Sequence, residues 1–229
     1  MPASPKSTPS PARAYGGVAL EERVAARRAR FIEAGTELFG TQGFRGATVR
    51  GICAAAGLTD RYFYESFESL EALLAEVFRT LTGEFAARLT EVATRFHAAH
   101  AGPVDDATIQ AQTTVGYELW FDFVRDPRFA RIVLVEVLGV SAAIDALYEE
   151  LLQAMAELTV ATLTAMQPTI KLTRVRRELL GRALVGSGQQ VAKMWMTGGY
   201  KLPRRDVVRT CVTVATGTLA ALRAEGTRA

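Results

Sequence analysis

The chain has 229 residues, of which 49% are apolar and 22% charged, and this is enough apolar sequence for a sizeable buried core. It contains no run of about 18 uninterrupted apolar residues, as a membrane span requires, and no apolar signal-peptide stretch, so we expect a cytoplasmic protein. Residues 1–67 hold nine Lys/Arg against six Asp/Glu, which accounts for the whole net charge of +3. This distribution is typical of a polyanion-binding module on a neutral body, although a solvated basic helix face would look the same.

The first predicted elements are a tail and a helix. Residues 1–20 contain four prolines among serines and alanines without apolar periodicity, and this predicts a disordered tail. A helical pattern begins at Glu21, with Phe31, Leu38 and Phe39 on its apolar face, and Gly40 and Gly43 are expected to end it.

Two short helices follow. Thr48 is a suitable N-cap for a helix that closes at Gly57, and Thr59 can cap the next helix, which runs toward Phe67. Two short helices joined through a glycine have the shape of a helix-turn-helix, whose second helix enters the major groove of DNA. From Phe67 a long amphipathic helix is predicted as far as about residue 99.

Prolines and glycines divide the rest of the chain into further helices, predicted over residues 109–125, 127–140, 144–167, 172–197 and 204–224. No strand alternation is found. The fold class is therefore all-α, with about nine helices. We divide it into a tail (1–20), a three-helix helix-turn-helix domain (21–68), and a helical domain for effector binding and dimerisation (69–229).

A family resemblance sharpens this interpretation. The segments FIEAGTELF (31–39), GF (43–44), TVRGI (48–52), AGLT (56–59) and FYESF (63–67) together resemble the N-terminal signature of the TetR family of repressors. The resemblance covers about 50 residues. It implies a dimeric transcriptional repressor that binds palindromic operator DNA until a small molecule releases it.

The matching positions and their chemistry suggest residues for DNA binding. At the start of the supporting helix, a hydroxyl, backbone amides and a guanidinium can hold phosphate oxygens, and the leading positions of the recognition helix face the groove. Arg61 is the best candidate for base readout, and Tyr64 resembles the family's phosphate-binding tyrosine. The full set is Thr48, Arg50, Thr59, Asp60, Arg61, Tyr62 and Tyr64.

The sequence also departs from the family pattern. Asp60, Ser66 and Leu70 stand where the family often has lysine, histidine and lysine, and each lost phosphate contact lowers nonspecific DNA affinity. A TetR-like ligand-binding protein or co-regulator that no longer binds DNA is therefore an alternative. Lys6, Arg13 or Arg23 could compensate by contacting the DNA backbone or minor groove, although for Lys6 and Arg13 we favour a solvated tail.

An aromatic face in the body suggests a ligand site. Residues 117, 120, 121 and 124 recur at helical spacing, and such a face is usually core, but the family's central helices surround a ligand cavity. Both interpretations stay open for each candidate. The candidates for lining a pocket, with a mainly apolar effector, are Tyr117, Trp120, Phe121, Val124, Leu134, Val137, Met155, Met194 and Trp195. For Glu136, a carboxylate in an apolar run, we favour an internal ion pair over a ligand contact.

The last two predicted helices suggest a homodimer interface. The final helix carries a broad apolar stripe, and the preceding helix is slim around Gly181 and Gly186. The resemblance implies a four-helix bundle with the symmetry mate, and packing within one chain is the alternative. The stripe consists of Val207, Val208, Cys211, Val212, Ala215, Leu219 and Leu222.

An enzyme is the rival from another functional class. His97 and His100 could share a helix face, but no acid completes a metal site, and Gly186-Ser187-Gly188 lacks the pattern of a nucleophile elbow. Cys53 and Cys211 have no ligand spacing and are expected to be buried reduced thiols. We therefore predict no catalytic residues, no metal and no cofactor.

Overall fold

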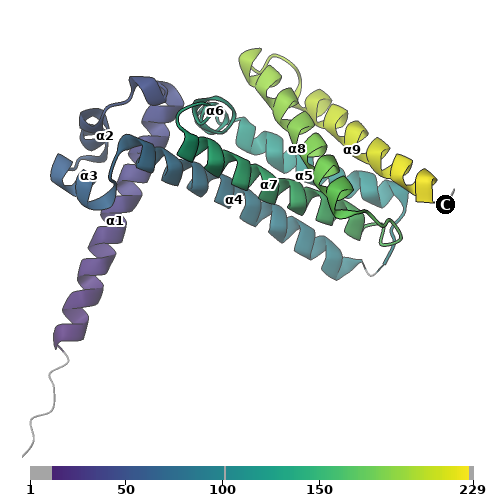
Figure 1. The fold of residues 1–229 in the computed structure, drawn as a ribbon, viewed down its shortest axis with the longest axis horizontal. Helices are drawn as coiled ribbons and strands as arrows, with labels where there is room; N and C mark the ends of the chain where they lie inside the picture. The colour runs from purple at the N-terminus through teal and green to yellow at the C-terminus, as the bar shows by residue number, and fades with distance from the viewer. Residues whose placement is uncertain (1–11, 101, 227–229) are drawn as a thin grey trace, which may run out of the picture.

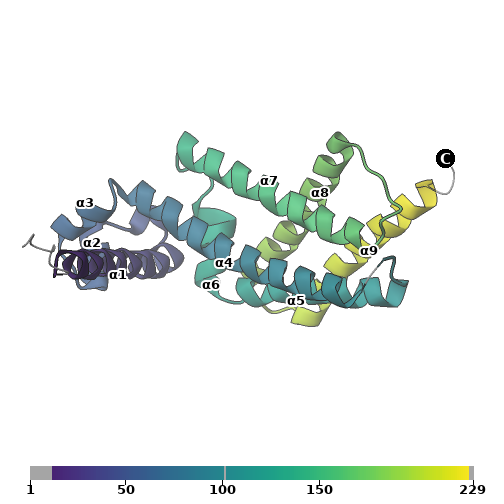
Figure 2. The same cartoon turned by 90° about the horizontal axis from the view of Figure 1, so that it is seen from below.

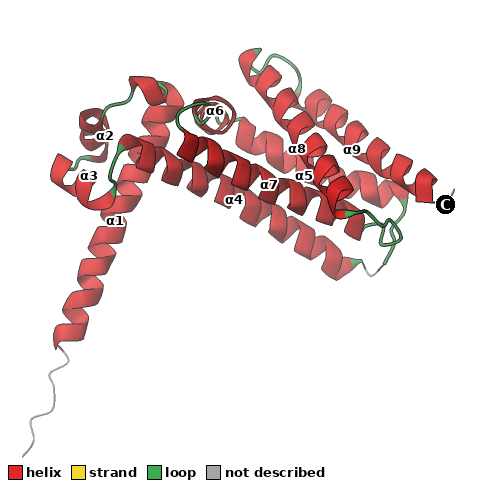
Figure 3. Cartoon of the chain, in the orientation of Figure 1, coloured by secondary structure: helices red, strands yellow, loops and turns green. Residues whose placement is uncertain are grey.

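The computed structural model describes residues 12–100 and 102–226. Within them the chain is entirely helical, with loops between the helices and no strand (Figure 1 and Figure 3). The all-α prediction is confirmed. The helices are α1 (Ala12–Thr41), α2 (Val49–Ala56), α3 (Asp60–Ser66), α4 (Leu70–Ala99), α5 (Asp106–Val124), α6 (Pro127–Arg131), α7 (Ala142–Ala165), α8 (Arg174–Thr197) and α9 (Arg204–Gly226), with a 3₁₀ turn η1 (Phe44–Gly46) and a π-helical turn η2 (Ile132–Glu136).

Helix α1 differs from its predicted bounds at both ends. It begins at Ala12 and not at Glu21, since every residue of the segment Ala12–Thr41 has a backbone N–H and nothing in it interrupts the helical hydrogen bonds. The predicted disorder of residues 1–11 lies outside the described residues. At the other end the helix continues through Gly40 to Thr41, so Gly40 is a helical residue and not a terminator.

An aromatic cluster holds the three N-terminal helices together. Phe31 of α1 meets Phe63 of α3 edge-to-face with ring centroids 5.5 Å apart, and Phe67 packs against both rings. Ile52 of α2 is fully buried in the same cluster. Edge-to-face pairs of this kind add stability beyond the apolar area they bury.

Arg28 ties α1 to the two helices that follow the turn. Its guanidinium donates to the Ser66 carbonyl at the end of α3 (2.9 Å), pairs with Glu76 of α4 (3.0 Å) and lies over the Phe67 ring. A cation at a helix C-terminus satisfies carbonyls that have no partner within the helix. Helix α3 is therefore fixed at its C-terminal end by a residue of α1.

The body is a bundle of α4, α5, α7, α8 and α9 (Figure 2). Helices α7 and α8 pack closely, because Gly181 has no side chain and a Cβ there would lie 2.6 Å from the Ala156 carbonyl oxygen. Helix α9 packs on α5 and α8. Among the described residues, α9 alone is long and apolar enough to cross a membrane, a test that a core helix also passes.

The N-terminal unit meets the body where α6 crosses α1. A Cβ at Gly40 would lie 2.7 Å from the Arg128 Cα, so the two helices approach each other backbone to backbone. Arg128 also pairs with Glu37 (2.8 Å) and Asp126 (2.8 Å). We call this contact, together with the Arg131 and Glu136 contacts described below, the joint.

Candidate DNA-binding surface and ligand cavity

The turn between α2 and α3 has the geometry of a helix-turn-helix. Thr48 caps α2, because its hydroxyl accepts from the Gly51 N–H (3.1 Å), as its sequence position predicts. Gly57 ends α2 with φ +61°, a left-handed conformation that side-chain-bearing residues rarely adopt. Thr59 is the N-cap residue of α3 but makes no side-chain capping bond, so its hydroxyl is available to another partner.

The exposed face of α3 carries the proposed DNA contacts. The Arg61 side chain is 84% exposed, and Tyr64 is 61% exposed with its ring edge-to-face on Phe63. Thr59, Asp60 and Arg50 of α2 are exposed as well. Without DNA, the Arg61 Nε donates to Glu65 Oε1 one turn along the helix (2.9 Å). An Arg61 contact to a base would have to replace this exposed ion pair, which costs little.

Tyr62 differs from the other candidates on α3. Its ring is partly buried, and the Arg27 guanidinium of α1 lies 4.5 Å above the ring centroid. A cation over an aromatic face is attracted by the ring quadrupole. Tyr62 therefore helps to fix α3 against α1, and the positive charge of Arg27 lies beside α3.

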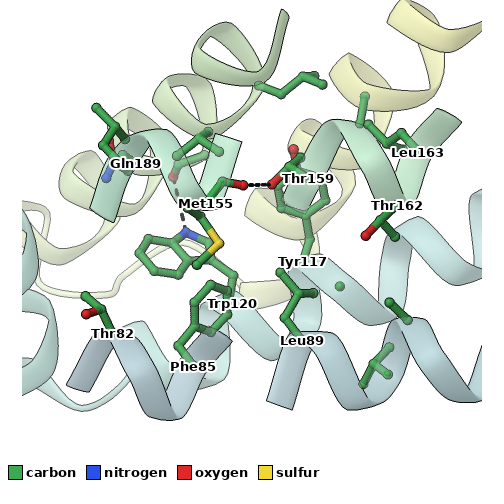
Figure 4. Close-up of a pocket in the computed structure, with 18 of the residues that line it drawn as sticks. Thr82, Phe85, Leu89, Tyr117, Trp120, Met155, Thr159, Thr162, Leu163 and Gln189 are labelled. Atoms are coloured by element: carbon green, nitrogen blue, oxygen red, sulfur yellow. Dashed lines mark hydrogen bonds between the residues drawn. The ribbon is translucent and has the colours of Figure 1, made fainter. Parts of the chain in front are cut away.

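The body contains a cavity of about 160 Å³, open on part of its surface, between α4, α5, α7 and α8 (Figure 4). Tyr117 and Trp120 enter it from α5, Phe85 from α4 and Met155 from α7. The indole N–H of Trp120 points to the Gly188 carbonyl at 3.4 Å, which is a weak bond. Burial raises the pKa of Tyr117 above its ordinary value, so its phenol stays neutral.

Comparison with known proteins bears on the N-terminal unit. Residues 31–77 match the family model of the bacterial regulatory proteins of the tetR family. Over these residues the N-terminal domain is similar to that family. A curated relative, the HTH-type transcriptional repressor KstR2 of Rhodococcus jostii, is 29% identical over 92 residues. That region is 40% of this chain and 42% of the relative's length, so less than half of that protein is matched.

Solved structures extend the likeness to the fold of the whole chain. FadR of Bacillus subtilis, in complex with stearoyl-CoA, has a TM-score of 0.69 at 17% identity, covering 82% of this chain and 97% of that one. A putative transcriptional regulator of Pseudomonas aeruginosa PAO1 has a TM-score of 0.69 at 21% identity, covering 87% and 93%. The body behind the TetR-type domain therefore has the helical fold of these regulators.

The cavity includes some of the sequence-predicted residues and leaves others out. Tyr117, Trp120 and Met155 line it. The predicted residues Phe121, Val124, Leu134, Val137 and Trp195 are buried in the core instead, and Met194 is exposed on the surface of α8. The sequence did not predict the wall contributed by α4. The apolar pattern of a long amphipathic helix does not indicate whether its residues contact packed core or a cavity.

Glu136 forms the ion pair that the sequence led us to favour. Its side chain is 14% exposed, and Oε1 accepts from Arg131 Nε at 2.8 Å. The other oxygen accepts from the Phe44 N–H of the TetR-type domain at 2.8 Å, and Arg131 also donates to the Thr41 carbonyl. A carboxylate of the body thus binds the backbone just after α1, and it is not among the residues that line the cavity.

The predicted dimer stripe on α9 requires a correction. Val207, Val208, Cys211, Val212, Ala215 and Leu219 are each at least 95% buried within one chain, and Leu222 is partly buried. These residues face α5 and α8, so packing within the chain accounts for the stripe. An apolar helix face shows that something covers it, but not whether the cover is the same chain or a second copy.

Proposed function

We propose that this protein is a dimeric DNA-binding transcriptional regulator, acting as a repressor that a small, mainly apolar ligand releases from a palindromic operator. The observation that carries the proposal is a TetR-type domain with an exposed polar α3, in direct contact with a body that contains an apolar cavity. The likeness to ligand-binding regulators of the same fold supports it. A protein of this function acts in the cytoplasm.

The segment from Pro127 to Glu136 offers a route for the ligand to act. Phe129 and Val133 line the cavity, whereas Arg128, Arg131 and Glu136 of the same segment contact the end of α1 and η1. A ligand that displaces the cavity wall therefore also displaces the joint. The coupling must be reciprocal, so operator DNA weakens ligand binding by the same factor, typically about 1–3 kcal/mol.

Dimerisation is proposed through the outer faces of α8 and α9, opposite to the buried stripe. Exposed apolar residues lie there, together with small residues that permit close helix packing, as in Thr210, Thr213 and Gly217 on α9. A two-fold axis along these helices would present two copies of α3 to successive turns of the major groove. The exposed apolar side chains are Val175, Leu179, Met194 and Val214.

The second candidate function is a TetR-like protein that binds ligand but not DNA. Asp60 places a negative charge at the start of α3. The Ser66 carbonyl accepts a hydrogen bond from Arg28, and the Leu70 side chain packs against the core. These three positions supply no cation to phosphates, which lowers the electrostatic part of DNA affinity.

A mobility-shift assay against the upstream region of the protein's own gene separates the two candidates. Specific retardation is expected for the wild type, with loss of retardation when ligand is added. Trp120→Ala should keep operator binding but lose the ligand response, because Trp120 lines the cavity far from α3. A folded wild type that fails to shift any fragment of that region would favour the second candidate.

Light scattering tests the dimer. Leu179→Glu with Val214→Glu should give monomers, because each substitution places a carboxylate on the proposed interface. Leu20→Glu, also on an exposed apolar residue but on α1, is the matched control and should leave the dimer intact. A wild-type monomer at micromolar concentration would contradict the proposed bundle.

A further inference from the structure

The lining of the cavity carries no full charge. Its polar side chains are threonines, the amides of Gln112 and Gln189, the phenols of Tyr117 and Tyr148, and the indole of Trp120, whose N–H points to the Gly188 carbonyl. Burial raises the pKa of both tyrosines, so both stay neutral in the physiological range. An ionised group held in this cavity would lose its hydration without gaining a counter-charge, which is strongly unfavourable.

Most hydroxyls of the lining already have a partner. Thr82 donates to the Phe78 carbonyl (2.7 Å), Thr159 to the Met155 carbonyl (2.9 Å) and Thr162 to the Leu158 carbonyl (2.8 Å). Figure 4 shows the Thr159 bond at the cavity wall. Each bond runs to the residue four positions earlier, the usual solution for a threonine within a helix.

Thr113 is the exception among the threonines of the lining. It is 7% exposed, and its hydroxyl oxygen is buried without a hydrogen-bond partner. Its neighbour Thr114 donates to Gln110 in the usual way, so the backbone of α5 does not prevent such a bond. A buried hydroxyl without a partner costs about 1–3 kcal/mol, and native proteins seldom keep one unless something else occupies it.

The cavity is also long. Along α5 it runs from Gln112 to Trp120, and along α4 from Phe78 to Ala93, which is roughly 22 Å at the rise of an α-helix. Apolar side chains line most of this length. Thr113 lies about two turns of α5 from Trp120, so a group bonded to Thr113 would leave the rest of a ligand to extend over the aromatic residues.

We propose that the cavity takes an elongated ligand that is uncharged where it is enclosed, and that the Thr113 hydroxyl binds the ligand's single buried polar group, a hydroxyl or a carbonyl. This rests on the proposed function in taking the cavity as the effector site. It excludes a carboxylate held inside the cavity. Thr113 selects a polar group at one position of the ligand. The other lining threonines contribute only to the shape of the wall, because their hydroxyls are bonded to backbone carbonyls.

Matched ten-carbon probes test the charge selectivity by isothermal titration calorimetry on the DNA-free protein. Affinity for 1-decanol should stay constant between pH 6 and pH 8. Affinity for decanoate should fall about tenfold for each pH unit, because only the protonated acid enters and its pKa lies well below this range. A pH-independent decanoate affinity equal to that of 1-decanol would overturn the proposal, and so would a failure of 1-decanol to bind.

The Thr113→Val variant tests the hydrogen bond. It keeps the shape of the side chain, and it should bind 1-decanol about three- to tenfold more weakly than the wild type. Thr159→Val is the matched control, since its hydroxyl is already bonded, and should change the affinity less than twofold. Equal affinities of Thr113→Val and wild type would remove Thr113 from the site.

Stability supplies a second measurement for the same variant. Replacing an unpartnered buried hydroxyl by a methyl group should leave the midpoint of unfolding unchanged or raise it. A lower midpoint would show that the hydroxyl has a structural partner and would contradict the ligand role. These experiments need no DNA, so a failed mobility shift with normal 1-decanol binding would count against the proposed function alone.

Discussion

In the TetR-type domain the aromatic side chains meet one another, whereas in the body several of them face a cavity. Phe31, Phe63 and Phe67 fill the space between α1 and the short helices α2 and α3. Phe85 and Trp120 touch each other with ring centroids 5.2 Å apart, and both also line the cavity. The difference shows that the side chains of the N-terminal domain fill its core, whereas those of the body leave a space between the helices.

The largest expected effect comes from emptying the packed cluster. Phe63→Ala should lower the free energy of unfolding by about 3–5 kcal/mol, because the fully buried ring leaves a void among rigid neighbours. Phe85→Ala should cost less, about 1–3 kcal/mol, since its ring already faces empty space and loses fewer contacts. Chemical denaturation measures both. Equal losses would mean that the cavity wall is as tightly packed as the N-terminal core.

A methyl group at the crossing of the two regions should also destabilise the protein. Gly40→Ala places a Cβ against the Arg128 backbone, so α6 must move away from α1 at a cost of at least about 1–3 kcal/mol. Gly83→Ala is the control, because it lies within α4 with nothing within 4 Å of the new Cβ. This control should raise the midpoint of thermal unfolding, since alanine favours helix by up to about 1 kcal/mol.

On the proposed DNA-binding surface, two substitutions should separate sequence readout from phosphate binding. Arg61→Ala should relax base preference at one operator position, at a cost of about 1–3 kcal/mol. Tyr64→Phe should weaken binding to all sequences alike and by less, because it removes only a hydroxyl. Affinities for a panel of operator variants measure both. A uniform loss for Arg61→Ala would assign Arg61 to the phosphate backbone.

The smallest expected effect concerns the carboxylate of the joint. Glu136→Gln should lower the free energy of unfolding by about 1–2 kcal/mol, because a charge-assisted bond to the Phe44 N–H and the partner of Arg131 are both lost. Glu91→Gln removes the exposed partner of Arg95 and should change stability by less than about 0.5 kcal/mol. Indistinguishable losses would show that the joint is no firmer than a surface ion pair.

The sequence predicts the N-terminal domain well because its signals are local. Thr48 as a cap and Gly57 as a turn act within a few residues, and the structure has both where the pattern indicates. Gly40 shows the limit of such signals. The sequence pattern predicts a helix terminator at Gly40. In the structure Gly40 instead lets α1 approach the backbone of Arg128, a residue far along the chain.

The candidate cavity was harder to predict for the same reason. Tyr117 and Trp120 share a helix with Phe121 and Val124, and the four are alike in the apolar pattern. Their surroundings differ because different helices face them. Tyr117 and Trp120 line the cavity, whereas Phe121 and Val124 are buried in the core of the body. Thr113 could not be found from sequence at all, since a missing hydrogen bond is a property of the folded chain.

The two cysteines give each region its own chemical reporter. Cys53 of α2 and Cys211 of α9 are both buried, and burial raises the pKa of each thiol to about 11. In the closed protein both thiols are therefore shielded and protonated, and an alkylating reagent can react with them only after local opening. The alkylation rates of Cys53 and Cys211, measured in one sample, therefore report the local opening of the two domains separately. No cysteine has to be introduced for this measurement.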